Sequence, residues 1–166
     1  LHNVAHSFPT RRSSDLSPTG FTENAISLVE AELSQFPEVK LSRTRKGALL
    51  AQIEGEDPSQ MHALTAHVDT LGAMVKEIKA SGRLKLTKIG GYAWNTVEGE
   101  GCWVHTFDGG KVRGSILLAK SSSHVHGSAV AEDKRDDNAM EVRLDARTTT
   151  ADETRALGIG VGDFVS

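Results

Sequence analysis

The sequence TAHVDTLGAMV occupies residues 65–75 and is more informative about the fold than any other part of the chain. It overlaps an apolar run, 61–66, which predicts a buried β-strand ending at a histidine and an aspartate. In an extended segment residues i and i+2 point to the same side, so we expect His67 and Asp69 to share one face. A metal-binding histidine usually donates its other ring N–H to a carboxylate. The pair is therefore a candidate metal ligand with its orienting carboxylate. Spacing alone equally allows a structural His–Asp pair without metal.

Short strand patterns separated by glycine turns follow this stretch. Such spacing predicts a small all-β barrel or sandwich. Residues 121–138 are polar and are expected to be irregular. A short helix is expected at 150–157, where Thr150 and Glu153 fit a capping box and Gly158 fits a C-cap. The strand candidates are residues 73–79, 83–89, 102–107, 111–118, 140–144 and 160–165.

A helical pattern and a hairpin pattern precede the same stretch. Apolar residues at helical spacing predict a helix over 21–36, ended by Pro37. Two short strands, 39–43 and 48–53, are expected to join at a turn around Lys46-Gly47. A helix followed by strands of this kind is typical of the start of an α/β layered domain.

Composition narrows the functional classes. The chain has 166 residues and a formal net charge of −3 at pH 7, without a basic stripe, so no nucleic-acid partner is expected. No apolar run reaches the roughly 18 residues of a membrane span, so no membrane association is expected. Cys102 is the single cysteine, which excludes an intrachain disulfide and favours a reducing, cytoplasmic location. We expect Cys102 to be a small buried apolar residue rather than a nucleophile.

Residues 1–16 differ in composition from the rest of the chain. Within them, His6–Leu16 reads HSFPTRRSSDL, which looks like one reading frame of a common short-read sequencing adapter. So many consecutive matches are very improbable by chance. We therefore expect residues 1–16 to be adapter-derived rather than native, and to carry no information about the fold.

Other candidate sites are weaker. His124 and His126 repeat the i, i+2 spacing and could hold a metal, but no carboxylate lies near them in sequence. The acidic run 133–137 is most simply a solvated charge cluster. For the remaining candidates a structural role is the commoner one: a turn for Asp145, and packing or an interface for Trp94 and Trp103.

Several motifs occur in the same order as in one known family. The chain resembles the dinuclear metallo-aminopeptidases that include glutamyl and deblocking aminopeptidases and the tetrahedral (TET) peptidases, some of which carry an endoglucanase label. Each motif alone is weak, but their colinearity over residues 17–165 is strong. The matching segments are the Ser-Pro-Thr-Gly turn at 17–20, the His-x-Asp block at 66–75, Ile-Gly-Gly at 89–91, Lys-Val-Arg-Gly at 111–114, and segments 140–145 and 158–165.

The resemblance implies a domain plan. Residues 17–72 would be the N-terminal part of a catalytic domain with a peptidase α/β sandwich fold. Residues 73–163 would form an inserted small all-β, barrel-like domain with its return segment. Residues 164–166 would re-enter the catalytic domain, at which point the sequence given ends.

The resemblance also implies a chemistry. His67 would be a metal ligand, and the catalytic role of Asp69 would be to orient it. Thr70 replaces a glutamate that members usually carry, which changes the surroundings of the site without removing a ligand. The complete enzyme would use two divalent ions, zinc most simply and otherwise cobalt or manganese, to remove N-terminal residues from peptide substrates. It would assemble as a homo-oligomer. The remaining ligands and the general base would lie beyond Ser166, so the 166-residue chain by itself is expected to be inactive.

Two alternatives remain from the sequence. The chain could be a fragment of a related carboxypeptidase or deacylase-type metallohydrolase, in which His-x-Asp-Thr also occurs. In that clan the lid domain usually follows the main ligands, whereas here a β module follows His67 at once. The second alternative is a non-enzymatic, β-rich interaction module, which describes residues 73–163 physically.

Overall fold

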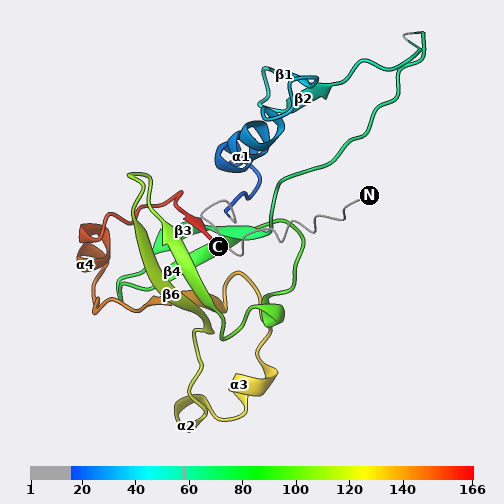
Figure 1. Cartoon of the computed structure of the whole chain (residues 1–166). Coiled ribbons are helices and arrows are strands. Elements are labelled where there is room, and N and C mark those ends of the chain that lie inside the picture. The colour runs from blue at the N-terminus through cyan, green and yellow to red at the C-terminus, as the bar shows by residue number, and fades with distance from the viewer. Residues whose placement is uncertain (1–15, 58) are drawn as a thin grey trace, which may run out of the picture. The chain divides into compact units, whose positions relative to one another are not determined.

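The computed structural model describes residues 16–57 and 59–166 (Figure 1). It divides the chain into two compact units, of which the first ends at Thr70 and the second spans Leu71–Ser166. The expectation that residues 1–16 derive from an adapter lies outside the described residues, apart from Leu16. The domain plan inferred from the sequence stays a prediction.

The first unit contains a helix and a hairpin, as expected. Helix α1 spans Glu23–Leu33, and strands β1 (Lys40–Arg43) and β2 (Leu49–Gln52) pair antiparallel. The helix is shorter at both ends than the predicted 21–36. Gly47 lies in the turn with φ +85°, a left-handed conformation that glycine adopts without steric cost.

An ion pair network joins α1 to the hairpin. The Arg43 guanidinium on β1 donates from Nη1 to Glu23 Oε1 at 2.6 Å and from Nε to Glu30 Oε2 at 2.9 Å. These hydrogen bonds with Arg43 lower the pKa of the Glu23 carboxyl below its usual value. The network therefore fixes the side of the helix on which the hairpin lies.

The buried strand expected at residues 61–66 is wrong. This segment has no strand structure in the described part of the chain, and its apolar side chains are exposed, with Met61 at 90% and Leu64 at 103%. A strand needs a neighbour to satisfy its N–H and C=O groups. The ladder of β2 is with β1, and among the described residues no strand pairs with residues 61–66. The apolar pattern is real, but its partner is missing from the described residues.

The second unit is a closed antiparallel barrel of six strands in the order β3-β4-β7-β6-β5-β8. It confirms the small all-β module predicted from the glycine-punctuated strands, and it is a barrel rather than a sandwich. The strands are β3 (Gly72–Ile78), β4 (Leu84–Ile89), β5 (Gly101–His105), β6 (Lys111–Leu118), β7 (Met140–Leu144) and β8 (Phe164–Val165).

The interior of the barrel holds the hydrophobic core. Alternate residues of each strand point inward, as the two-residue period of a strand requires. In β6, for example, Gly114, Ile116 and Leu118 are buried, while their neighbours are more exposed. The buried core consists of Ala73, Val75, Leu84, Leu86, Trp94, Cys102, Val104, Ile116, Leu118, Met140, Val142, Leu144, Ile159 and Val165.

Strand β8 closes the barrel. Ala73 of β3 and Val104 of β5 are both register partners of Val165, and Val165 is only 2% exposed. The carboxylate of Asp163, just before β8, accepts hydrogen bonds from the N–H groups of Gly160 at 2.8 Å and Phe107 at 3.1 Å. Residues expected to begin the return to a catalytic domain thus form the last barrel strand.

A buried carboxylate ties β7 to the turn between β3 and β4. The Glu141 side chain is only 4% exposed and accepts hydrogen bonds from Lys79 Nζ at 2.7 Å and from Arg83 Nη1. A buried charge is tolerated when it is paired in this way. Lys79 and Arg83 therefore compensate the charge of Glu141, the one strongly buried glutamate of the described barrel, and the three side chains are called the triad below.

The polar segment between β6 and β7 contains two short helices, α2 (Ser123–His126) and α3 (Ala129–Glu132). Two side chains near its end attach it to the 3₁₀ turn η2 (Trp94–Thr96) and the following loop. Asp137 Oδ1 accepts from Trp94 Nε1 at 2.6 Å, and Arg135 Nε donates to Glu98 Oε2 at 2.8 Å. Although the sequence pattern is irregular, its last part is therefore held by specific contacts.

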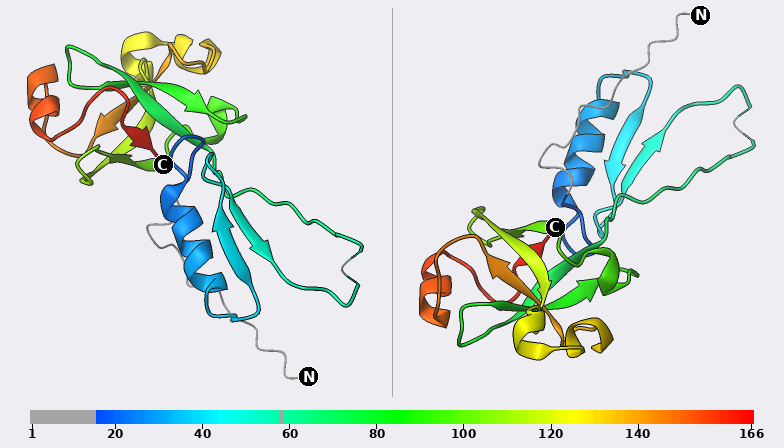
Figure 2. Two further views of the ribbon diagram at one scale, coloured as in Figure 1. Left: turned by 90° about the horizontal axis from the view of Figure 1, so that it is seen from above. Right: turned by 90° about the horizontal axis from the view of Figure 1, so that it is seen from below.

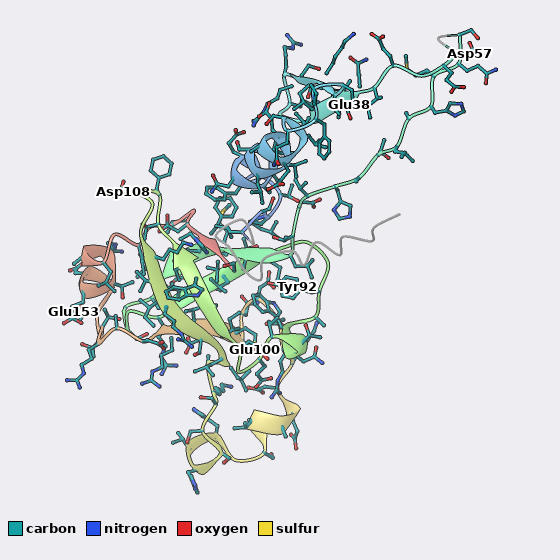
Figure 3. All side chains as sticks on the ribbon, viewed as in Figure 1. Glu38, Asp57, Tyr92, Glu100, Asp108 and Glu153 are labelled. Carbon is teal, nitrogen blue, oxygen red and sulfur yellow. The ribbon has the colours of Figure 1, made fainter. Side chains whose placement is uncertain are left out.

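Helix α4 (Ala151–Ala156) has the predicted capping box. Glu153 N donates to Thr150 Oγ1 at 3.2 Å, and Thr150 N donates back to Glu153 Oε2 at 3.1 Å. Figure 3 labels Glu153 on this helix. The C-cap is Leu157, and Gly158, expected there, follows it with φ +85°. Figure 2 shows α4 and the α2–α3 segment on different sides of the barrel. None of the helices in the described residues is both long and apolar enough to cross a membrane.

The buried position of Cys102 predicts an unreactive thiol. Burial, together with the negative charge of Asp145, raises the pKa of Cys102 to about 12. Because only the thiolate is nucleophilic, iodoacetamide at pH 8 is expected to label the folded chain at least about a hundredfold more slowly than the urea-unfolded chain. Intact mass spectrometry over time measures both rates. Labelling of the folded chain at the rate of an unfolded cysteine would contradict the buried placement.

Candidate functional site

The segment that contains His67 and Asp69 is hydrogen-bonded to residues near the start of the described chain. Pro18 and Thr70 form an isolated parallel bridge. The Thr70 N–H donates to the Ser17 carbonyl at 2.8 Å, and the Ser17 N–H donates to Thr70 Oγ1 at 3.2 Å. Thr70 therefore serves the backbone arrangement directly. The Ser-Pro-Thr turn and the His-x-Asp segment, some 50 residues apart in sequence, lie side by side as a result.

Within this segment, His67 and Asp69 are in contact, as the i, i+2 spacing predicts. His67 Nδ1 lies 2.9 Å from Asp69 Oδ1, and the other carboxylate oxygen, Oδ2, accepts from Thr19 Oγ1 at 3.2 Å. An ionised carboxylate only accepts hydrogen bonds, so the neutral imidazole must donate from Nδ1. Nε2 then keeps its lone pair, which is the atom a metal ion would require.

The solvent exposure of His67 and Asp69 indicates that their contact orients the imidazole rather than stabilises the fold. The side chains of His67 and Asp69 are 83% and 46% exposed. A histidine–carboxylate contact this accessible to water contributes at most about 1 kcal/mol to folding. The geometry has a clearer consequence for the imidazole, because it fixes one tautomer and one ring direction.

A cavity of about 560 Å³ lies beside the pair in the first unit. Apolar side chains of α1 and β2 form much of its wall, since the apolar face of α1 is turned toward the hairpin. The polar side chains at the cavity are those of Thr19, His67 and Asp69, together with Thr22. Its lining consists of Thr19, Gly20, Thr22, Ile26, Val29, Leu33, Ala48, Leu49, Ala51 and residues 66–69.

The described residues do not by themselves form a metal centre. Across residues 16–57 and 59–166, no three His, Cys, Asp or Glu side chains are grouped closely enough to bind a metal ion. Catalytic zinc generally takes three protein ligands. His67 with its carboxylate fits the first of these ligands in its chemistry, and further ligands must come from other residues.

The alternative pair, His124 and His126, does not have the geometry expected from its spacing. Both residues lie in the single turn of α2 rather than in an extended segment. In a helix, residues two apart point in different directions. The same-face expectation is therefore wrong for these histidines, because their local structure is helical.

The acidic run and Trp94 have structural roles. Asp137 holds the Trp94 indole, Asp136 Oδ1 accepts from the Asn138 N–H at 2.9 Å, and Trp94 is 2% exposed within the core. The run is therefore more than a solvated cluster. Asp145 lies 3.5 Å from Arg113, and Trp103 is 45% exposed.

Sequence reasoning missed Thr19. It was part of a turn motif, but nothing in the sequence indicated that its hydroxyl reaches Asp69, a residue 50 positions away. The only available signal was the presence of the Ser-Pro-Thr-Gly turn at the start of the colinear motifs.

Residues 47–166 match the family described as M42 glutamyl aminopeptidase. The chain belongs to the M42 family. A relative of this M42 chain, YhfE of Bacillus subtilis (strain 168), is 48% identical over 150 residues, which cover 90% of this chain and 43% of YhfE. The M42 chain therefore spans less than half the length of that relative.

Solved structures show the same fold. Aminopeptidase APDkam598 from the archaeon Desulfurococcus kamchatkensis is 27% identical, with a TM-score of 0.77 over 90% of this M42 chain and 39% of that one. The Pyrococcus horikoshii TET1 peptidase is 20% identical, with a TM-score of 0.67, covering 90% of this chain and 42% of that one. The second likeness, at this low identity, concerns the fold alone.

Proposed function

We propose that this chain is part of a metal-dependent aminopeptidase, which removes N-terminal residues from peptides. The observation that carries the proposal is the contact of His67 Nδ1 with Asp69 Oδ1 at 2.9 Å in a chain of the M42 family. The family description and the name of APDkam598 both refer to aminopeptidases.

In the proposed centre, His67 binds metal through Nε2. Asp69 holds the proton at Nδ1 of the ring, and the Thr19 hydroxyl holds Asp69 in turn. Two divalent ions, zinc most simply and otherwise cobalt or manganese, would supply a water of lowered pKa and would polarise the scissile carbonyl. The further ligands and the general base would come from residues outside the sequence given.

The domain plan is part of the same proposal. Residues 17–72 would open a catalytic α/β sandwich, and residues 73–163 would be a barrel domain inserted into it. The helix and hairpin of the first unit, and the closed barrel of the second, support a division into two domains, although the barrel strands run from Gly72 to Val165. The cavity beside His67 would then face the rest of the catalytic domain.

Assembly and location complete the proposal. The Pyrococcus horikoshii TET1 peptidase is described as assembling into a tetrahedron or a large octahedral shell, which supports a homo-oligomer for the complete protein. Its single, buried cysteine supports a cytoplasmic location.

The test is hydrolysis by the longer protein that contains this chain. We expect it to cleave aminoacyl-p-nitroanilides, to lose this activity with EDTA, and to regain it with zinc, cobalt or manganese. N-acetylated substrates provide the control, because an aminopeptidase requires a free α-amine. Hydrolysis of N-acyl amino acids, or release of C-terminal residues from peptides, without release of nitroaniline would favour the deacylase or carboxypeptidase alternative. Absence of hydrolysis at saturating metal would favour the interaction module.

The 166-residue chain alone is expected to show no metal-dependent hydrolysis. Its described residues provide one histidine ligand, and a single imidazole cannot hold a catalytic ion firmly. The measurement is the same nitroanilide assay with each of the three metals, run beside the longer protein. Metal-dependent turnover by the purified 166-residue chain would show that the missing ligands are not required.

A further inference from the structure

A second cavity, unconnected with the peptidase proposal, lies on the barrel. It has a volume of about 600 Å³ and is formed by the β3–β4 turn, the end of β7 and the segment that follows β7. Its wall is rich in cationic and hydroxyl groups. These are the arginines Arg83, Arg143 and Arg147 and the hydroxyl residues Ser81, Thr148 and Thr149.

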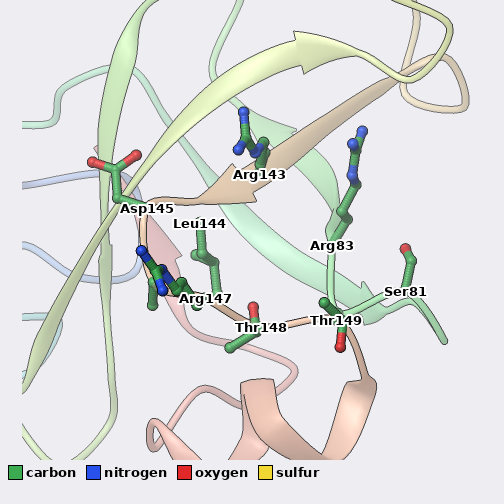
Figure 4. A pocket seen from close by; sticks show the side chains of 10 residues that line it. Ser81, Arg83, Arg143, Leu144, Asp145, Arg147, Thr148 and Thr149 are labelled. Atoms are coloured by element: carbon green, nitrogen blue, oxygen red, sulfur yellow. The ribbon is translucent and has the colours of Figure 1, made fainter.

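Two of the arginines lie on neighbouring segments, Arg83 immediately before β4 and Arg143 in β7. The β4–β7 register pairs Lys85 with Glu141 and Leu84 with Val142, and Arg83 and Arg143 are the next residues along the two segments. Figure 4 shows the side chains of Arg83 and Arg143 extending in the same direction from these two segments. Like charges directly opposite each other in a sheet are destabilising. Such a pair needs a compensating anion.

The anions of the barrel only partly provide it. Glu141 is shared between Lys79 and Arg83. Asp145, which also lines the cavity, lies 3.5 Å from Arg113. Across the described residues no carboxylate lies within ion-pair distance of Arg143 or Arg147. The Ser81 and Thr148 hydroxyls likewise have no hydrogen-bond partner in the described part of the chain.

We propose that this cavity binds an anion with two or more charged oxygens, of the phosphate or carboxylate class. Guanidinium groups match such oxygens with paired, charge-assisted hydrogen bonds. The hydroxyls of Ser81 and Thr148, which also line the cavity, add further donors. The ligand would remove the repulsion between Arg83 and Arg143, so that its binding and the stability of the barrel are linked.

The experiment is isothermal titration of the 166-residue chain at low ionic strength. The probes are inorganic phosphate and triglutamate, with sodium chloride of matched ionic strength as the reference. We expect saturable binding of at least one probe, with a Kd of about 1 mM or tighter. Phosphate alone would identify phosphate esters as the class, triglutamate alone would identify carboxylates, and both would identify the shared chemistry. No saturable binding of either probe would overturn the proposal.

Matched variants test the location. The double variant Arg143→Gln and Arg147→Gln is expected to weaken binding at least tenfold, whereas Arg45→Gln, an exposed arginine of the other unit, should leave it within about twofold. Equal loss in both would overturn the site, because it would show only a general charge effect.

Arg143→Gln alone has a further signature. It should raise the thermal midpoint of the ligand-free chain, because it removes the repulsion of the like-charge pair. It should also weaken binding of the anion. A fall of both the thermal midpoint and the anion affinity would indicate that Arg143 has a merely structural role, and would also overturn the proposal. Circular dichroism at each stage checks that the variants are folded.

Discussion

Replacing His67 with alanine in the longer protein is expected to lower metal-dependent kcat/KM by more than about 100-fold. The substitution removes the ring nitrogen that the contact with Asp69 leaves available to a metal ion, and loss of a direct ligand should exceed the roughly 10- to 100-fold cost of losing an orienting partner. Folding should be unaffected, because the side chain is 83% exposed. The measurement is nitroanilide hydrolysis, combined with bound metal by atomic emission.

Two further variants make this test specific. Asp69→Asn keeps the shape of the side chain but replaces the carboxylate with an amide. It is expected to lower kcat/KM about 10- to 100-fold. His62→Ala is the matched control, since His62 is an exposed histidine of the same segment without a hydrogen bond or ion pair in the described residues. Its activity should stay near that of the wild type. If His67→Ala retained full activity and full metal content, the proposed ligand would be wrong.

Replacing Glu141 with alanine is expected to lower the free energy of unfolding of the barrel by about 2–4 kcal/mol. Removing one partner of a buried ion pair leaves uncompensated charge, at a usual cost of about 3–5 kcal/mol. The range is set lower here because Lys79 and Arg83 are 34% and 37% exposed and can recover some hydration. Urea unfolding of the 166-residue chain, followed by tryptophan fluorescence, reports on this unit through the core residue Trp94.

The control is Asp152→Ala, which removes a carboxylate from an exposed pair. Asp152 lies 2.9 Å from Arg155, and the two side chains are 95% and 57% exposed. This substitution should cost less than about 1 kcal/mol. A Glu141→Ala effect no larger than that of the control would show that the triad adds little to the barrel.

Most of the barrel could be predicted from local pattern. Strand β7 has the predicted bounds, Met140–Leu144, because its inward residues alternate and both ends change composition. The capping box of α4 needs only residues three apart. The strand expected at 61–66 failed for the opposite reason. An apolar run indicates that burial of its side chains is favourable. A strand also requires a hydrogen-bonded neighbouring strand, and strand pairing is not determined by the local sequence.

In the candidate site, too, local contacts could be predicted from the sequence and long-range contacts could not. The contact of His67 with Asp69 follows from the two-residue period of an extended chain, and it is present. The contact of Thr19 with Asp69 joins residues 50 positions apart, and no spacing rule reaches that far. The pair His124 and His126 shows that the same spacing means something else in a helical turn.

The pairing of Ala73 with Val165 has a consequence for how such a chain is put together. These residues are register partners on adjacent strands, so the polypeptide enters and leaves the barrel about 5 Å apart. A module with neighbouring entry and exit points can be spliced into a loop of another domain without prising that domain open. It can equally be excised, since a linker of two or three residues would span the gap. Under the proposed domain plan, recombination can therefore exchange the barrel as a unit.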